Sequence, residues 1–295
     1  MGDASVASRT FSARLRTHVG RLAGDIGPRC ADRPEALIQC AEYIEDALAS
    51  YGYETTRYAC EPAELPVWNI EAKRPAVEAP RPVTVVGAHY DTVPGSPGAN
   101  DNTSGVAGLL TLAESLADDP IVNTVRFCAF PNEENPYFHT PLMGSYQYAK
   151  LCRDRKDRIR LMLCLETIGY YSKEANTQGY PLPLSWFYPS TADFVAFVGD
   201  LRNLSIVRAC RDAFRACSDF PCQMLCAPAF FPGVAASDHW SFWKFGYPAV
   251  MITDTANLRY RHFHRPEDTP DKLEYESFAA VVQGVAGLLG QISHD

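Results

Sequence analysis

Several residues of this chain stand at places where their side chains could bind a metal ion or transfer a proton. Imidazole and carboxylate groups are common zinc ligands, and both also act as acids or bases. The candidates stand after short apolar runs or in a late loop. They are His89, Asp91, Asp101, Glu133, Glu134, Glu166, His262 and His264. Their types indicate a metal site with a base beside it.

The first segment, GAHYDTVPGSPGAND, places His89 directly after an apolar run and Asp91 two positions later. A ligand histidine usually gives its second ring nitrogen to a carboxylate, and Asp91 is well placed for that role. Asp101 then stands just before a helix start. Taken alone, the segment fits equally well a polar pair that closes a strand, with Asp101 as a helix cap.

The second segment, RFCAFPNEENPYF, puts Glu133 and Glu134 side by side after another apolar run. Adjacent carboxylates repel each other unless a cation is present or one of them keeps its proton. The pair therefore suggests one metal ligand and one general base. An acidic turn at the surface is the alternative, because pairs of glutamates are common.

Two further segments add more candidates. LCLETIGYY isolates Glu166 at the end of an apolar run, where an unpaired carboxylate would be costly to bury. RYRHFHRPEDTPDKL offers His262 and His264 in a loop. Each of these side chains could also simply reach solvent. The four segments together are more specific than any one of them because of their order and their placement at predicted strand ends and in a late loop.

The elements that must position these residues alternate along the chain. Short apolar runs predict strands, and apolar residues at three- and four-residue steps predict helices. The predicted strands are Tyr53–Tyr58, Val67–Ala72, Val83–Ala88, Val125–Phe130, Leu161–Leu165 and Ala249–Thr253. The predicted helices are residues 33–51, 103–116, 144–151, 192–214 and 272–289.

Alternating strands and helices predict an α/β fold, a sandwich in which helices cover both faces of a largely parallel (mixed) central sheet. Ligands bind at the carboxyl edge of such a sheet, which is where His89, Glu133, Glu134 and Glu166 would meet. We find no long linker rich in glycine, proline or serine, and therefore expect one domain over residues 1–295. Residues 171–184 are the expected loop insertion.

Composition excludes several classes of partner. A formal charge of -8 and a pI near 5.4 argue against nucleic acid, which normally requires a basic surface. No apolar run approaches the roughly 20 residues that span a bilayer. The sequence as written predicts a cytoplasmic protein, or a periplasmic or secreted one if an export signal has been removed. Ten scattered cysteines argue against a zinc site built from cysteine.

The four segments, in this order, resemble the zinc aminopeptidases known as the M28 peptidases. SDHWSFWKFGYPAVMITD is similar to the family's Ser-Asp-His stretch, with Asp238 beside the ligands rather than among them. The resemblance implies a zinc exopeptidase-like fold and two zinc ions per chain, bridged by Asp101. His89 and Glu166 would be the further ligands of one ion, and Glu134 and His264 those of the other. Glu133 would be the general base.

Two positions depart from that family's pattern. Many members have aspartate where Glu166 stands, and the longer side chain could shift the metal. Some bacterial and secreted members have a tyrosine near the last ligand histidine, where this chain has Phe263. A hydroxyl group would then have to come from elsewhere, for example from Tyr260, or be absent.

The resemblance implies an exopeptidase, most often an aminopeptidase acting on peptides. Aromatic residues near the motifs, such as Phe138, Tyr170 and Trp240, could line an apolar pocket or belong to the core. A glutaminyl cyclase-like acyltransferase, a carboxypeptidase or a deacylase remain alternatives on the same fold. The sequence indicates neither the oligomeric state nor the preferred side chain of the substrate.

Overall fold

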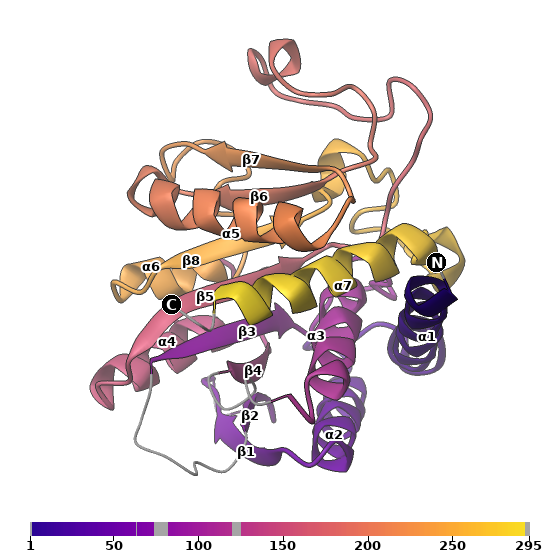
Figure 1. The fold of residues 1–295 in the computed structure, drawn as a ribbon. Coiled ribbons are helices and arrows are strands. Elements are labelled where there is room, and N and C mark those ends of the chain that lie inside the picture. The colour runs from indigo at the N-terminus through magenta and orange to yellow at the C-terminus, as the bar shows by residue number, and fades with distance from the viewer. Residues whose placement is uncertain (1, 63, 74–81, 120–124, 293–295) are drawn as a thin grey trace.

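The computed structural model describes residues 2–62, 64–73, 82–119 and 125–292. One eight-stranded sheet runs through it in the order β1-β2-β4-β3-β5-β8-β6-β7 (Figure 1). The strands are β1 Glu54–Ala59, β2 Trp68–Lys73, β3 Val83–His89, β4 Val125–Phe130, β5 Ile159–Glu166, β6 Val195–Gly199, β7 Cys222–Cys226 and β8 Ala249–Thr253. The central strands β4, β3, β5 and β8 are parallel, whereas β2 and β6 join them antiparallel. The predicted α/β fold with a mixed sheet is confirmed.

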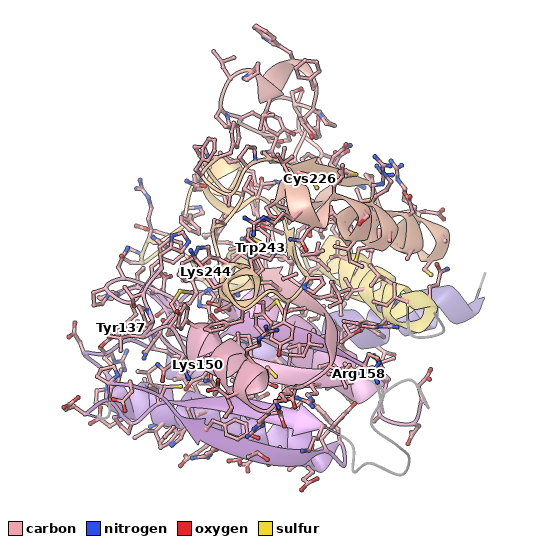
Figure 2. The ribbon with its side chains drawn as sticks, turned by 90° about the vertical axis from the view of Figure 1, so that its left-hand side faces the viewer. Tyr137, Lys150, Arg158, Cys226, Trp243 and Lys244 are labelled. Atoms are coloured by element: carbon pink, nitrogen blue, oxygen red, sulfur yellow. The ribbon has the colours of Figure 1, made fainter. Side chains whose placement is uncertain are left out.

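Helices cover both faces of the sheet. One apolar core joins it to α1, α2, α3, α5 and α7, and a second core joins it to α4 and α6. Lys150 of α4 and Trp243 of α6 mark the second face (Figure 2). The helices are α1 Gly2–Val19, α2 Pro34–Ser50, α3 Thr103–Ser115, α4 Gly144–Asp154, α5 Leu204–Cys217, α6 His239–Lys244 and α7 Tyr275–Ile292, and a π-helix, Gly20–Ile26, extends α1. Within the described residues, none of the helices combines the length and apolarity that crossing a bilayer requires.

The central strands are mostly apolar because helices cover them on both sides. In β3 all residues after Val83 are buried, and so are all residues of β8. Strand β3 therefore holds its last residue, His89, in a fixed place. Helix α3 is buried from Thr103 to Ala113, and the side chain of Asn102 caps it by accepting the N–H of Gly105.

The predicted helix over residues 192–214 is wrong in its first part. Val195–Gly199 is strand β6, which is fully buried between β8 and β7, and α5 begins only at Leu204. A short apolar run such as VAFVG has no periodicity that separates a buried strand from a buried helix. The prediction also lacked α1, α6 and the edge strand β7, which carries half-buried side chains.

A long segment joins β5 to β6 and extends away from the body of the molecule (Figure 1). We call residues 171–194 the arm; the expected insertion, residues 171–184, lies within it. Its one short helix in the described structure is the 3-10 turn Leu184–Trp186. The hydroxyl of Tyr188 donates to the carbonyl of Met224, which ties the arm to the sheet edge at β7.

Candidate active site

The carboxyl ends of the parallel strands bring the candidate residues together. His89 is the last residue of β3 and Glu166 the last of β5, while Glu133 and Glu134 follow β4. Asp101 lies just before α3, and His264 lies in the loop between β8 and α7. All of them except His264 are at least nine-tenths buried. Residues far apart in the chain therefore meet in one place.

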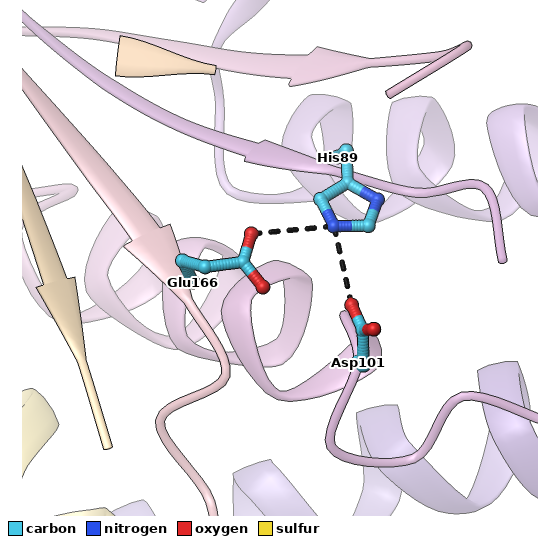
Figure 3. A group of neighbouring side chains, drawn as sticks. All are labelled: His89, Asp101 and Glu166. Atoms are coloured by element: carbon cyan, nitrogen blue, oxygen red, sulfur yellow. Dashed lines mark ion pairs between the residues drawn. The ribbon is translucent and has the colours of Figure 1, made fainter. Parts of the chain in front are cut away.

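His89, Asp101 and Glu166 form the first of two groups of potential ligands (Figure 3). Nε2 of His89 lies 3.3 Å from Oδ1 of Asp101 and 3.3 Å from Oε2 of Glu166. The other ring nitrogen, Nδ1, lies 3.2 Å from the carbonyl oxygen of Asp91 and 3.4 Å from its Oδ1. A proton on Nδ1 would thus face Asp91, which leaves the lone pair of Nε2 toward the two carboxylates.

Asp101, Glu134 and His264 form the second group. Nε2 of His264 lies 2.9 Å from Oδ2 of Asp101 and 3.2 Å from Oε1 of Glu134. Asp101 therefore gives one oxygen to each group. The side chain of His264 is 38% exposed, so the second group stands nearer to solvent than the first.

The donor atoms fit two cations bound by nitrogen and oxygen. Tetrahedral zinc with ligands at about 2.0–2.1 Å places neighbouring ligand atoms roughly 3.3 Å apart, close to the observed separations. In each group one imidazole nitrogen faces two carboxylates, although a single N–H can point well at only one of them. Oε1 of Glu134 is buried and makes no well-aligned hydrogen bond in the described structure, although Nε2 of His264 lies 3.2 Å away. A metal ion would satisfy these atoms together.

Glu133 belongs to neither group but lies beside the first. Its Oε2 is 3.9 Å from Nε2 of His89, and the residue is 5% exposed. Burial, together with the charges of Glu134 and Glu166, raises the pKa of Glu133 well above its ordinary value, although His89 opposes this shift. A carboxylate with a raised pKa that is not a ligand is suited to accept and return a proton.

The carboxylate of Asp91 links the strand ends. It accepts the backbone N–H groups of Glu133 at 3.2 Å and Glu134 at 3.0 Å, and it also faces His89. Asp91 therefore orients a histidine and the two glutamates at once. The sequence did not predict this contact to the backbone after β4. Every residue except proline has a backbone N–H, so the residue types do not show which of them donates a hydrogen bond.

Three polar side chains for which the sequence predicted no role support the ligands. Asp268 accepts the N–H groups of Asn100 and Asp101 through its two oxygens, and Ser237 Oγ donates to Glu166 Oε2 at 2.7 Å. The Asn102 amide lies 3.4 Å from the same oxygen. Asn102 follows Asp101, and Ser237 and Asp268 lie within two of the recognised motifs. This proximity is the one sequence signal that could have predicted a supporting role for them.

Asp238 lies outside both ligand groups. It is fully buried, and its oxygens have no hydrogen-bond partner in the described structure. Burial raises its pKa to about 7, against the attraction of His89.

A cavity of about 390 Å³ opens beside the two groups. Asp101, Glu133, Glu134 and Glu166 form part of its lining. Most of its other lining is apolar and comes from the arm, β6, β7 and β8. This lining includes Leu184, Tyr188, Phe194, Ala196, Val198, Met224, Leu225 and Met251.

Most of the aromatic residues expected near the pocket do not reach it. Phe138 lines the cavity, but Tyr170 and Trp240 do not. The expected hydroxyl of Tyr260 is also missing from the lining, because it donates to Oδ1 of Asp268 at 2.8 Å. Phe263 does line the cavity.

Without bound metal, the protein should lose stability as the pH rises. Burial alone lowers the pKa of His264, but its hydrogen bonds to Asp101 and Glu134 raise it from 6.5 to about 10. Burial and the charge of Asp101 raise the pKa of Glu134 from 4.5 to about 7. Between about pH 4.5 and pH 10 these two groups bind more protons in the folded chain than in the unfolded chain. The free energy of unfolding therefore falls as the pH increases in this range.

Thermal unfolding of the chelator-treated protein at pH 5.5, 7.5 and 9.5 tests this directly. We expect the midpoint to fall along the series, and more gently in His264→Ala. A midpoint that rises with pH would show that the site does not hold protons as described.

Comparison with known proteins places this geometry in a family. The sequence model of peptidase family M28 matches residues 69–289. YfbL, an uncharacterized protein of Escherichia coli K12, is 37% identical over 285 residues, which cover 94% of this chain and 87% of that protein. Leucine aminopeptidase 2 of Trichophyton rubrum is 35% identical over 103 residues, which cover 35% of this chain and 20% of that enzyme.

The fold has solved counterparts as well. BSAP, a zinc aminopeptidase from Bacillus subtilis, superposes with a TM-score of 0.74 at 16% identity and covers 95% of each chain. At that identity the likeness concerns the fold alone. The family match, in contrast, spans all four motifs and both ligand groups. The resemblance drawn from the motifs is confirmed, and the chain belongs to peptidase family M28.

Proposed function

We propose that this peptidase is an aminopeptidase that binds two zinc ions per chain and releases residues from the amino end of peptides. One observation carries the proposal: two ligand groups share Asp101, beside a buried Glu133 that belongs to neither. The similarity to a zinc aminopeptidase of known structure supports zinc as the metal.

In this proposal each residue has a distinct task. His89, Asp101 and Glu166 hold one ion, and Asp101, Glu134 and His264 hold the other. Zinc supplies Lewis acidity and lowers the pKa of water toward about 7. Asp91 keeps His89 in the tautomer whose Nε2 faces the site, and it fixes the backbone that carries both glutamates.

Glu133 moves the proton. Its carboxylate takes a proton from the attacking water and returns it to the nitrogen of the leaving amine. Glu133 is placed for both steps because its Oε2 lies 3.9 Å from Nε2 of His89 while the residue belongs to neither ligand group. The longer side chain of Glu166, compared with the aspartate of many relatives, still brings its Oε2 to 3.3 Å from His89.

The charges around the cavity favour the amino end of a peptide over the carboxyl end. Four carboxylates line it, and no lysine or arginine does so among the described residues. A carboxypeptidase would need a cation for the terminal carboxylate of its substrate, for which arginine is the usual partner. A substrate amino group needs no such cation, and the carboxylate oxygens beside the metal site can accept its hydrogen bonds.

The apolar part of the cavity suits a large apolar first residue. Leu225 and Met251 line it from the sheet, and Leu184, Tyr188 and Phe194 line it from the arm. Each buried methylene of a substrate side chain is worth about 0.8 kcal/mol, so a leucyl substrate should be preferred to an alanyl one. A lysyl substrate would place a charge against apolar walls.

Aminoacyl chromogenic substrates and matched peptides test the proposal. We expect cleavage of leucyl substrates well ahead of alanyl and lysyl ones, and at least a hundredfold slower cleavage when the amine is acetylated. Equal rates on acetylated and free peptides would contradict an aminopeptidase and favour a deacylase or carboxypeptidase. Conversion of an amino-terminal glutamine to its cyclic form without shortening of the peptide would favour the cyclase.

A further inference from the structure

Arg29 lies between the π-helix and α2 and is the largest polar side chain that is almost fully buried in the described structure, at 1% exposure. Its guanidinium makes five hydrogen bonds, and every acceptor is a neutral oxygen. They run from Nε to Tyr90 O at 2.8 Å, from Nη1 to Leu22 O at 3.0 Å, Gly27 O at 2.7 Å and Pro97 O at 2.9 Å, and from Nη2 to Thr103 Oγ1 at 2.7 Å.

Arg29 holds the backbone on both sides of Asp91. Its Nε binds the carbonyl of Tyr90, its own N–H donates to Thr92 Oγ1 at 3.0 Å, and its carbonyl accepts the N–H of Thr92 at 2.9 Å. Asp91 stands between these two anchored residues. Its carboxylate in turn positions His89 and the backbone of Glu133 and Glu134.

The same guanidinium also holds the loop that carries Asp101. It binds the carbonyl of Pro97 before Asp101 and the hydroxyl of Thr103 after it. The N–H of Thr103 donates to Gly98 O at 3.0 Å, which closes this loop. One rigid planar group thus joins the two segments that supply His89 and Asp101.

The charge of Arg29 also faces the site. Arginine stays protonated in proteins, and this cation lies within electrostatic reach of Asp91, Asp101 and Asp268 without pairing directly with a carboxylate. It therefore offsets part of the negative charge that the ligands bring together. Arg29 can hold the two segments and offset this charge without binding a metal ion or transferring a proton itself.

We propose that Arg29 is a positioning residue of the metal centre. Its guanidinium fixes the spacing between the segment Tyr90–Thr92, which contains Asp91, and the loop Pro97–Thr103, which contains Asp101. This inference rests on the proposed metal site and adds to it a residue outside both ligand groups. Partners that orient metal ligands typically contribute roughly 10- to 100-fold to metal affinity.

Arg29→Lys keeps the charge but loses the planar fork, so we expect its zinc affinity to fall by roughly 10- to 100-fold. Arg126→Lys is the matched control. Arg126 is half-buried and pairs with Asp157 and Glu71, but it stands at the start of β4, away from the carboxyl edge. Competition with a chromogenic zinc chelator measures affinity, and thermal unfolding of the metal-free proteins measures the structural cost separately.

The inference is supported if Arg29→Lys binds zinc more weakly and Arg126→Lys does not, while both variants lower the thermal unfolding midpoint by a similar amount. Native zinc affinity in folded Arg29→Lys would overturn it and leave the proposed function standing. If Arg29→Lys does not fold, Thr103→Val removes only the acceptor of Nη2; a several-fold loss of affinity supports the inference and an unchanged affinity overturns it. A native protein that binds no zinc would overturn the proposed function and this inference together.

Discussion

Glu133→Gln should bind zinc as the native protein does and yet lose nearly all peptidase activity. The amide has almost the shape of the carboxylate but cannot accept the proton of the attacking water. General acid–base catalysis contributes roughly 10²–10⁴-fold, and we expect kcat on a leucyl substrate to fall within that range. Zinc content should not change, because Glu133 belongs to neither ligand group.

Glu267→Gln is the matched control, since Glu267 is an exposed carboxylate in the loop just after His264. It should keep native kcat. Full activity in Glu133→Gln would refute the role of the base, and loss of zinc from that variant would instead identify Glu133 as a ligand.

Asp101→Asn should lose both metal ions. Oδ1 of Asp101 faces His89 and Oδ2 faces His264, so this one side chain completes both groups. The amide is neutral and retains only one acceptor oxygen. Zinc affinity should fall by more than the roughly 10- to 100-fold effect of an orienting partner, and activity should fall with it.

Two variants that each affect one group serve as controls for Asp101→Asn. Glu166→Gln weakens only the group around His89, and His264→Ala removes a ligand only from the other. After dialysis against the same zinc buffer, each should retain about one ion per chain, whereas Asp101→Asn retains none. If Asp101→Asn kept the same zinc content as the single-group variants, Asp101 would not be the shared ligand.

Much of the site could be predicted because strand ends in a parallel sheet converge. His89, Glu134 and Glu166 each follow a buried apolar run, and apolar runs are visible in the sequence. Once β3, β4 and β5 lie next to one another, their ends meet at one edge whatever the loops do. The resemblance to the M28 peptidases then singled out His264 in the late loop.

The supporting contacts could not be predicted, for a physical reason. Arg29 reaches Thr103 across 74 residues, and four of its five acceptors are backbone carbonyls, which every residue type provides. Asp268 likewise binds backbone N–H groups. Tyr260 was expected to offer a hydroxyl group to the substrate, but its partner is Asp268, a pairing that depends on how the loop folds.

The strand β6 was mistaken for a helix because burial on both faces removes the alternation that marks a strand. The arm escaped a detailed prediction because proline and aromatic residues without periodicity specify no regular element. Its contribution to the cavity follows from contacts with β7 that are formed only in the folded chain, such as Tyr188 to Met224.

Anomalous diffraction at the zinc edge from zinc-loaded crystals tests the central claim most directly. We expect two zinc peaks in each chain, one bound by His89, Asp101 and Glu166 and one by Asp101, Glu134 and His264, with Glu133 bound to neither. A single peak, or a peak that takes Glu133 as a ligand, would contradict the account.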